Sequence, residues 1–283
     1  MKRARAYTEM VWLTLMRGAL LCVLLALFSL VGMVVWNGLP AISWRMLTDI
    51  PHGGFYLGGA GGIANAIVGS LLLASGATVL ALFIGIPIAL AMQREYFSPT
   101  ALRCITLCFD MLWGIPSIVY GAVAFSIMAL LGIGASLLGG ILTLTVLVIP
   151  IIVRALNGVF ALVPSELKEA SLALGATRFE TMTRVVFRQC LPGCATAVML
   201  AFGRAIGDAA SILFTAGYTD HMPRSLMDPV ASLPLAIFFQ LQTPLPAVQQ
   251  RAYAAALILL TLVLVTSALA RIASHRFSRV VLR

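Results

Sequence analysis

Two charged side chains lie inside an apolar stretch of the chain, where charges are rare. Arg204 and Asp208 are four residues apart in the run 193–214, so a helix would place both on one face. Burying either charge at the centre of a membrane costs about 3 kcal/mol, and pairing offsets part of that cost. A guanidinium group binds two oxygens of an oxyanion at once. The spacing therefore predicts either an anion pathway, with Asp208 holding Arg204 in place, or a purely structural ion pair.

A second group of distinctive residues lies in the polar stretch 164–192, between two long apolar runs. Glu166 and Glu169 fall in the first turn of a predicted helix, where the helix dipole favours acidic side chains. Gly175 is placed to end this helix, because glycine tolerates the backbone conformation found just after a C-cap. The apolar stripe of this first helix is expected to consist of Leu167, Ala170 and Leu174.

The same polar stretch predicts a second helix. Thr177-Arg-Phe-Glu180 is a capping-box sequence, so we expect this helix to begin there and to end at Pro192. An ordered, amphipathic hairpin of this kind suits two roles. It would lie on the membrane surface, helped by Arg184 and Arg188, or it would dock with a soluble protein. The residues alone leave both interpretations open.

The elements that position these residues are predicted to be membrane-spanning helices. The chain is 61% hydrophobic and 10% charged, whereas soluble domains are about a quarter charged. We therefore expect an all-α polytopic membrane protein, with one transmembrane domain over residues 1–283 and core spans over about 63–274. Apolar runs that can cross about 30 Å of hydrocarbon predict six transmembrane helices, near 18–36, 63–92, 104–131, 136–163, 193–214 and 252–274.

The distribution of lysine and arginine predicts the orientation. Fifteen of these residues lie at the two termini and in the loops around 93–103 and 154–192, whereas only Arg45, Arg224 and Arg251 lie in the alternate loops. Basic residues favour the cytoplasmic side, so both termini and the hairpin are expected in the cytoplasm. The same topology signals account for the net charge of +9 without any nucleic acid partner.

Several classes of activity lack their sequence signals. The chain contains no Walker A motif and no H-E-x-x-H motif, and no histidine falls in a predicted span. The five cysteines do not show C-x-x-C spacing. We therefore expect no enzymatic activity, no metal and no cofactor in this chain. A secondary transporter or channel subunit remains an alternative, although neither needs a docking hairpin.

The hairpin resembles a segment of a known family. Glu169-Ala-Ser171, followed by Gly175 and then by Leu191-Pro192, is similar to the cytoplasmic E-A-A loop of bacterial ABC-importer permeases. Ser171 stands where the second alanine is usual. In that family the first short helix of the loop docks in a groove of the ATPase subunit. The resemblance implies that the residues coupling this chain to ATP-binding subunits are Glu166, Glu169, Ala170, Leu174 and Gly175.

Other segments resemble phosphate-importer permeases, and most closely the PstA type, which pairs with a PstC-type subunit. They lie at 61–69, 114–121, 207–217 and 232–237. Where those permeases usually read Gly-Glu-Thr-Ala-Pro, this chain has Gly207-Asp-Ala-Ala-Ser211. The resemblance implies ATP-driven import of inorganic phosphate through the bacterial inner membrane, with an external phosphate-binding protein as partner. Sulfate, molybdate or another oxyanion is the alternative substrate.

Overall fold

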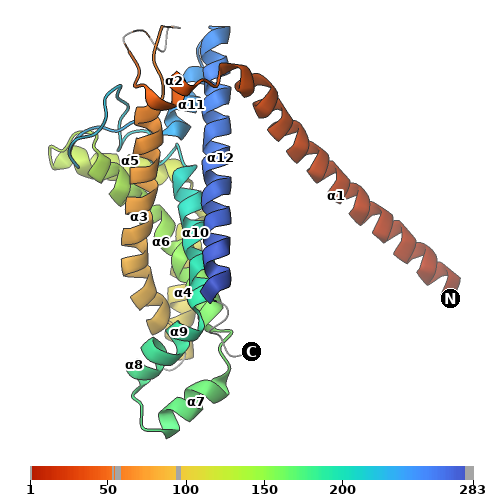
Figure 1. Ribbon diagram of the computed structural model, residues 1–283. Helices are drawn as coiled ribbons and strands as arrows, with labels where there is room; N and C mark the ends of the chain where they lie inside the picture. Colours follow the sequence, from red (N-terminus) through yellow and green to blue (C-terminus); the bar gives the residue numbers. More distant parts are fainter. Residues whose placement is uncertain (1, 53, 55–58, 94–96, 278–283) are drawn as a thin grey trace.

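A computed structural model describes residues 2–52, 54, 59–93 and 97–277 of the chain. Four long helices form the body of the molecule: α3 (Ala64–Ala91), α6 (Leu137–Phe160), α10 (Leu191–Ile206) and α12 (Pro246–Phe277) (Figure 1). Within the described residues every regular element is a helix, apart from an isolated bridge between Pro51 and Gly61. This confirms the all-α fold class.

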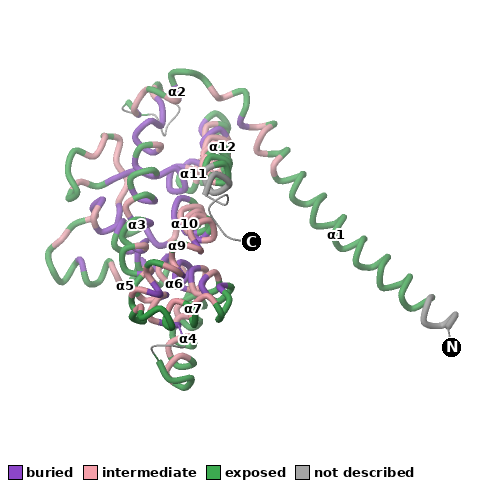
Figure 2. The backbone as a smooth tube through the Cα atoms, turned by 60° about the horizontal axis from the view of Figure 1, so that its bottom comes forward, coloured by how far each residue is buried: buried purple, intermediate pink, exposed green. Residues whose placement is uncertain are grey.

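Small residues let α3 and α6 pack closely, as is usual where apolar helices meet inside a membrane. Ala74, Ala77 and Ala81 on α3 are fully buried. A Cβ atom added at Gly85 would come within 2.8 Å of a methyl group of Ile152 on α6. Figure 2 shows this buried centre of the bundle in purple. The sequence provides close contact here by using residues with little or no side chain.

The first helix, α1 (Lys2–Gly38), projects away from the bundle (Figure 1). Its side chains are exposed along most of its length, as the green tube in Figure 2 shows. It approaches the bundle near its end, where a Cβ atom at Gly38 would lie 2.7 Å from the carbonyl oxygen of Tyr253 on α12. The predicted span 18–36 is therefore part of one longer helix that leans on α12 only at its last turns.

The predicted span over 104–131 is not one straight helix. The chain instead forms α4 (Pro99–Gly114) and α5 (Ser117–Leu130), which meet at an angle of 93°. Pro116 explains the break, because the residue before a proline is pushed out of the helical conformation. Ile115 accordingly has an extended backbone, with φ −71° and ψ 129°. Hydropathy did not reveal the break because the residues around it are apolar.

The predicted span over 193–214 is also only partly helical. Helix α10 ends at Ile206, and residues 207–217 follow as turns and irregular backbone. A short apolar stretch further along the chain forms α11 (Leu233–Leu241). In the described residues, four helices are long and apolar enough to cross a membrane, namely α1, α3, α6 and α12. The number of spans rises to six when each of the two sharply bent pairs, over 99–130 and 178–206, is counted as one span.

The remaining elements lie at the two ends of the bundle (Figure 1). The short elements η1 (Leu39–Ala41) and α2 (Trp44–Thr48) lie at the same end as α11. At the opposite end lies the hairpin, which consists of α7 (Ser165–Ala173), α8 (Arg178–Glu180), the π-helical segment η3 (Thr181–Val186) and α9 (Phe187–Gln189). Helix α12 also ends on the hairpin side, so the hairpin and the end of α12 share one side of the bundle.

We expect Gly69→Ala to destabilise the bundle. A Cβ atom at position 69 would collide with the carbonyl oxygen of Ala231, which belongs to the backbone and cannot rotate away. Overpacking of this kind costs about 1–3 kcal/mol, so the melting temperature in detergent should fall. Gly32→Ala on α1 is the matched control, since nothing lies within 4 Å of that position. Equal melting temperatures for the two variants would contradict this packing.

Candidate functional site

The turn after α7 depends on Gly175. Its φ is +87°, a conformation that only glycine adopts readily. The Gly175 amide donates to the carbonyl oxygen of Leu172 at 3.0 Å, and the Ala176 amide donates to that of Ser171 at 3.2 Å. These two bonds form the Schellman motif, which satisfies the last carbonyl groups of a helix. The predicted role of Gly175 as a helix stop is confirmed.

The second half of the hairpin begins with the predicted capping box. The Glu180 amide donates to Oγ1 of Thr177 at 3.2 Å, and the Thr177 amide donates to Oε2 of Glu180 at 3.0 Å. The amide and the hydroxyl of Thr177 both donate to this carboxyl, and with the nearby Arg184 guanidinium they lower the pKa of Glu180 below its ordinary value. The helix end predicted at Pro192 is wrong. The bend of 75° falls at Cys190, and Pro192 lies in the first turn of α10, where a proline is tolerated.

The second half of the hairpin is anchored in the core of the bundle. Met182 and Val186 are 2% and 0% exposed, and they belong to the same apolar cluster as Phe160 of α6. The ring of Phe187 lies 6.3 Å from the ring of Phe160, centroid to centroid. Displacement of this half of the hairpin therefore has to displace α6 or α10 as well.

The first half of the hairpin, α7, is exposed instead. None of its residues is buried. Of its predicted apolar stripe, Leu167 packs against the core cluster, whereas Leu174 is 90% exposed. Phe179, at the start of the second half, is 70% exposed. Acidic and small side chains complete this outward surface, namely Glu166, Glu169 and Ala170.

A hydroxyl pair joins the two halves of the hairpin. Oγ of Ser171 lies 2.9 Å from Oγ1 of Thr181, which is itself buried. Ser171 is the residue that replaces the alanine usual at this place in the E-A-A pattern. The replacement thus gives α7 a hydrogen bond to the anchored half that an alanine would lack.

The structure brings Arg204 and Asp208 together. Nη1 of Arg204 lies 2.5 Å from Oδ2 of Asp208, and the aspartate is only 3% exposed while the arginine side chain is 42% exposed. Asp208 lies just beyond the end of α10 rather than within a continuous helix. Its other oxygen, Oδ1, accepts the amide of Ser211 at 2.8 Å. The buried carboxylate therefore has two donors, and the exposed arginine keeps N–H groups directed away from it.

The irregular segment 207–217 is held by backbone contacts with neighbouring elements. The amide of Ser136 donates to the carbonyl oxygen of Thr215, and the amide of Val230 donates to that of Ala216, both at 2.9 Å. On the other side α5 approaches closely, because a Cβ atom at Gly121 would lie 2.5 Å from the carbonyl oxygen of Ser211. Asp208 is thus fixed by packed backbone.

A second ion pair was missed at the sequence level. Asp110 on α4 and Arg154 on α6 form a salt bridge, and their side chains are 43% and 32% exposed. The available signal was that each charge lies alone in a predicted span. Sequence spacing could not pair them, because 44 residues separate them.

The fold is that of a multi-pass membrane protein with an exposed helical hairpin at one end of its bundle. Residues 81–279 match the family described as "Binding-protein-dependent transport system inner membrane component". The chain therefore belongs to this family of ABC-importer permeases, which are multi-pass transport components of the inner membrane. Membership implies ATP-binding subunits and a periplasmic binding protein as partners.

Similar proteins include permeases that are named for the substrate they transport. The chain is 37% identical over 206 residues to the "Phosphate transport system permease protein PstA" of Mycobacterium leprae, covering 72% of this chain and 67% of that protein. It is 32% identical over 243 residues to the protein of the same name from Xylella fastidiosa, covering 84% and 82%.

Solved structures with a similar fold are also ABC transporters. An inward-facing MetNI methionine transporter matches with a TM-score of 0.60 at 20% identity, over 78% of this chain and 96% of that chain. A bacterial alginate transporter, in complex with a periplasmic protein that holds an alginate pentasaccharide, matches with a TM-score of 0.66 at 14% identity, over 95% of each chain. At these identities the likeness establishes the fold alone.

Proposed function

We propose that this chain is the permease subunit of an ATP-driven importer of inorganic phosphate. The observation that carries the proposal is the Arg204–Asp208 pair, in a chain whose similar proteins include phosphate permeases. Asp208 is buried and fixed, so it orients Arg204 without being displaced. The exposed guanidinium presents paired N–H donors that match two oxygens of phosphate.

The alternative substrates are other tetrahedral oxyanions such as sulfate and molybdate. The same guanidinium geometry suits them, and selectivity is expected to reside in the external binding protein. A secondary transporter or channel subunit is less well supported. Such a protein needs no exposed helix like α7 attached to a segment that is packed in the core of the bundle. The hairpin therefore favours an importer in which separate subunits hydrolyse the ATP.

We infer that ATP-binding subunits dock on the hairpin 164–192, and specifically on its exposed half, helix α7. In this proposal Glu166, Glu169, Ala170 and Leu174 form the contact surface, and Gly175 sets the turn that presents it. Closure of the ATP-binding subunits pulls the hairpin, and the anchored half moves the spans from inward-open to outward-open. ATP is hydrolysed in the separate subunits, and this chain has no enzymatic activity of its own.

The complete complex is proposed to contain a second, related permease of the PstC type and an external phosphate-binding protein, with lipid around the spans. Residues 1–283 form one transmembrane domain, and both termini and the hairpin lie in the cytoplasm. Cysteine labelling on a cysteine-free background checks this orientation. Ala176→Cys should react only with reagent supplied from inside, and Asp228→Cys only from outside. Labelling of position 176 from outside would reverse the orientation.

Arg204→Gln should lower phosphate uptake by roughly tenfold or more, equivalent to about 1.4 kcal/mol or more of lost interaction with the anion. Arg204→Lys should also be impaired, because an ammonium group cannot bind two oxygens in the same fork. The assay is radiolabelled phosphate uptake into vesicles that contain ATP and the intact complex, with sulfate and molybdate as competitors. Arg224→Gln, in an outer loop, is the control.

Two outcomes of this assay separate the parts of the proposal. Saturable phosphate uptake that persists in Arg204→Gln would remove Arg204 from the pathway. Uptake of sulfate or molybdate in place of phosphate by the wild-type complex would overturn the substrate while leaving the permease assignment intact.

Gly175→Val should uncouple transport from ATP while leaving the chain in the membrane. A β-branched residue at φ +87° costs on the order of 1–3 kcal/mol, so the turn after α7 would change shape. Glu169→Lys should act similarly by reversing a charge on the docking surface. Co-purification of the ATP-binding subunits and phosphate uptake should both fall, whereas Gly134→Val, at a glycine with no atom within 4 Å and no positive φ, should retain both. Normal uptake in Gly175→Val and Glu169→Lys would favour a surface helix instead.

A further inference from the structure

We propose that Asp208 and Ser211 are a matched pair, in which the backbone amide of Ser211 holds the carboxylate of Asp208 in the orientation that directs Arg204 toward the anion. Ser211 is thereby a positioning residue, because it acts on the anion only through two other side chains. The proposal rests on the proposed function in taking Arg204 as the group that binds the anion. It adds which neighbouring residues have to change together.

The buried carboxylate of Asp208 has a donor at each oxygen. Oδ2 lies 2.5 Å from Nη1 of Arg204, and Oδ1 accepts the amide of Ser211 at 2.8 Å. Asp208 is only 3% exposed, so solvent does not replace a donor that is lost. Without this amide the carboxylate would be free to rotate about its last bond. The amide therefore determines which oxygen meets Arg204, and in which plane.

The hydroxyl group of Ser211 takes no part in this arrangement. Ser211 is fully buried, and its Oγ has no hydrogen-bond partner among the residues that the structure describes. Position 211 therefore contributes an N–H group rather than a side chain. Proline is the amino acid that lacks a backbone N–H, so proline is the residue that this position excludes while Asp208 is present.

The length of the Asp208 side chain matches an amide three residues further on. A carboxylate that accepts this amide has the geometry of a helix N-cap, for which aspartate is among the favoured residues. A helical hydrogen bond follows directly, from the amide of Ala216 to the carbonyl oxygen of Ile212 at 3.0 Å. Glutamate is one methylene group longer, so its carboxylate would extend past the amide of Ser211. The residue types at positions 208 and 211 therefore depend on each other.

This dependence makes two departures of the chain into one. The phosphate-importer permeases that the segment resembles usually have glutamate and proline where this chain has Asp208 and Ser211. A proline offers no amide, and a longer glutamate needs none to reach an arginine four residues earlier. In this chain the carboxylate is one methylene group shorter, and an amide is present to hold it. Either change alone would leave the carboxylate poorly held.

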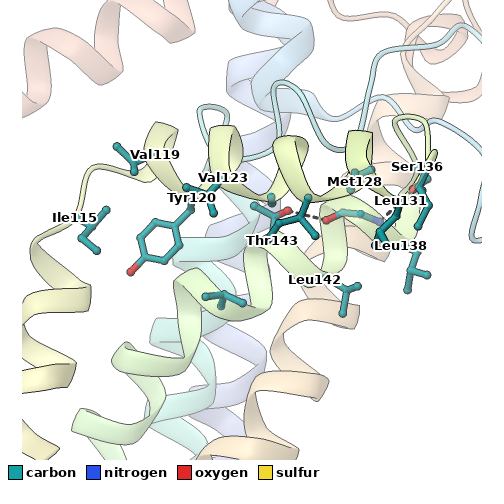
Figure 3. Close-up of a pocket in the computed structure, with 15 residues that line it drawn as sticks. Ile115, Val119, Tyr120, Val123, Met128, Leu131, Ser136, Leu138, Leu142 and Thr143 are labelled. Carbon is teal, nitrogen blue, oxygen red and sulfur yellow. Dashed lines mark hydrogen bonds between the residues drawn. The ribbon is translucent and has the colours of Figure 1, made fainter.

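A nearby cavity offers the anion no alternative site. Helix α5, which approaches the carbonyl oxygen of Ser211, also lines a cavity of about 470 Å³ against α6. Figure 3 shows Tyr120 on one wall of this cavity and Leu142 on the other. None of the described residues that line it is charged, and the Tyr120 hydroxyl already donates to the carbonyl oxygen of Leu112 at 2.6 Å. Changes at positions 208 and 211 should therefore act on the anion through Arg204.

The test is a cycle of variants assayed by ATP-driven anion uptake into vesicles that contain the intact complex. The maximal rate is compared, because affinity is expected to reside in the external binding protein, and each rate is divided by the amount of complex recovered. Ser211→Pro removes the amide, Ser211→Ala keeps the amide and removes only the hydroxyl, and Asp208→Glu adds the methylene group. The double variant Asp208→Glu/Ser211→Pro pairs glutamate with proline.

We expect Ser211→Pro and Asp208→Glu each to lower the maximal rate by about fivefold or more, because the buried carboxylate loses a well-placed donor. The double variant should recover to within about threefold of the wild type, which a merely structural defect at position 211 would not do. Ser211→Ala should stay within about twofold of the wild type, since it removes a buried hydroxyl that has no partner among the described residues.

Three results would overturn the matched pair. One is a double variant that is no better than Ser211→Pro, in rate or in recovered complex. Another is a wild-type rate in Ser211→Pro or in Asp208→Glu alone. The last is a loss of uptake in Ser211→Ala as large as that in Ser211→Pro, which would assign the role to the hydroxyl.

Failure of this inference remains distinguishable from failure of the proposed function. The rates are measured with whichever of phosphate, sulfate and molybdate the wild-type complex imports, so a different substrate leaves the comparison intact. Arg204→Gln is measured beside the other variants. Persisting uptake in Arg204→Gln would remove Arg204 from the pathway and overturn both proposals. Impaired uptake in Arg204→Gln without rescue in the double variant would overturn the matched pair alone.

Discussion

Burial of one half of a polar hairpin in an apolar core is the interaction on which the rest of the structure depends. Met182 and Val186 would favour a membrane or protein interior in any setting, but here they pack in the same cluster as Phe160 of α6. Because interiors are close-packed, a push on this half is transmitted to the spans rather than absorbed. The exposed half, which we propose binds the ATP-binding subunits, is held to the buried half by the Schellman turn at Gly175 and the hydroxyl contact between Ser171 and Thr181.

The membrane imposes the second constraint, that polar groups within it be satisfied. The protein meets it in two ways. Around Asp208, the irregular segment 207–217 is enclosed by its own neighbours, so the carboxylate is buried and only Arg204 faces outward. Around Asp110 and Arg154, the chain leaves the polar groups exposed, which makes sense only beside another protein or water. One site is complete within the chain, and the other is completed by a neighbouring protein or by water.

Much of this arrangement follows from local sequence. The helix stop at Gly175 and the capping box at Thr177 were predictable because each depends on residues within a few positions of one another. The breaks at Pro116 and after Ile206 were not, because hydropathy is averaged over windows and both breaks lie in runs that are apolar on average. The Asp110–Arg154 pair was beyond reach because it depends on how α4 packs against α6. The Arg204–Asp208 contact was predictable, but the end of α10 between them was not.

The central claim is that the hairpin transmits motion as a rigid unit, and a disulfide across its two halves tests it most directly. After replacement of the five native cysteines, Ser171→Cys and Thr181→Cys would place two thiols where hydroxyl oxygens now lie 2.9 Å apart. The measurement is ATP-driven phosphate uptake by the same complex before and after oxidation. A rigid hairpin predicts that the uptake rates before and after oxidation agree within about twofold. This ratio corresponds to a difference of about 0.4 kcal/mol in activation free energy. Loss of uptake on oxidation, restored by reductant, would show that the two halves must move apart and would contradict the account.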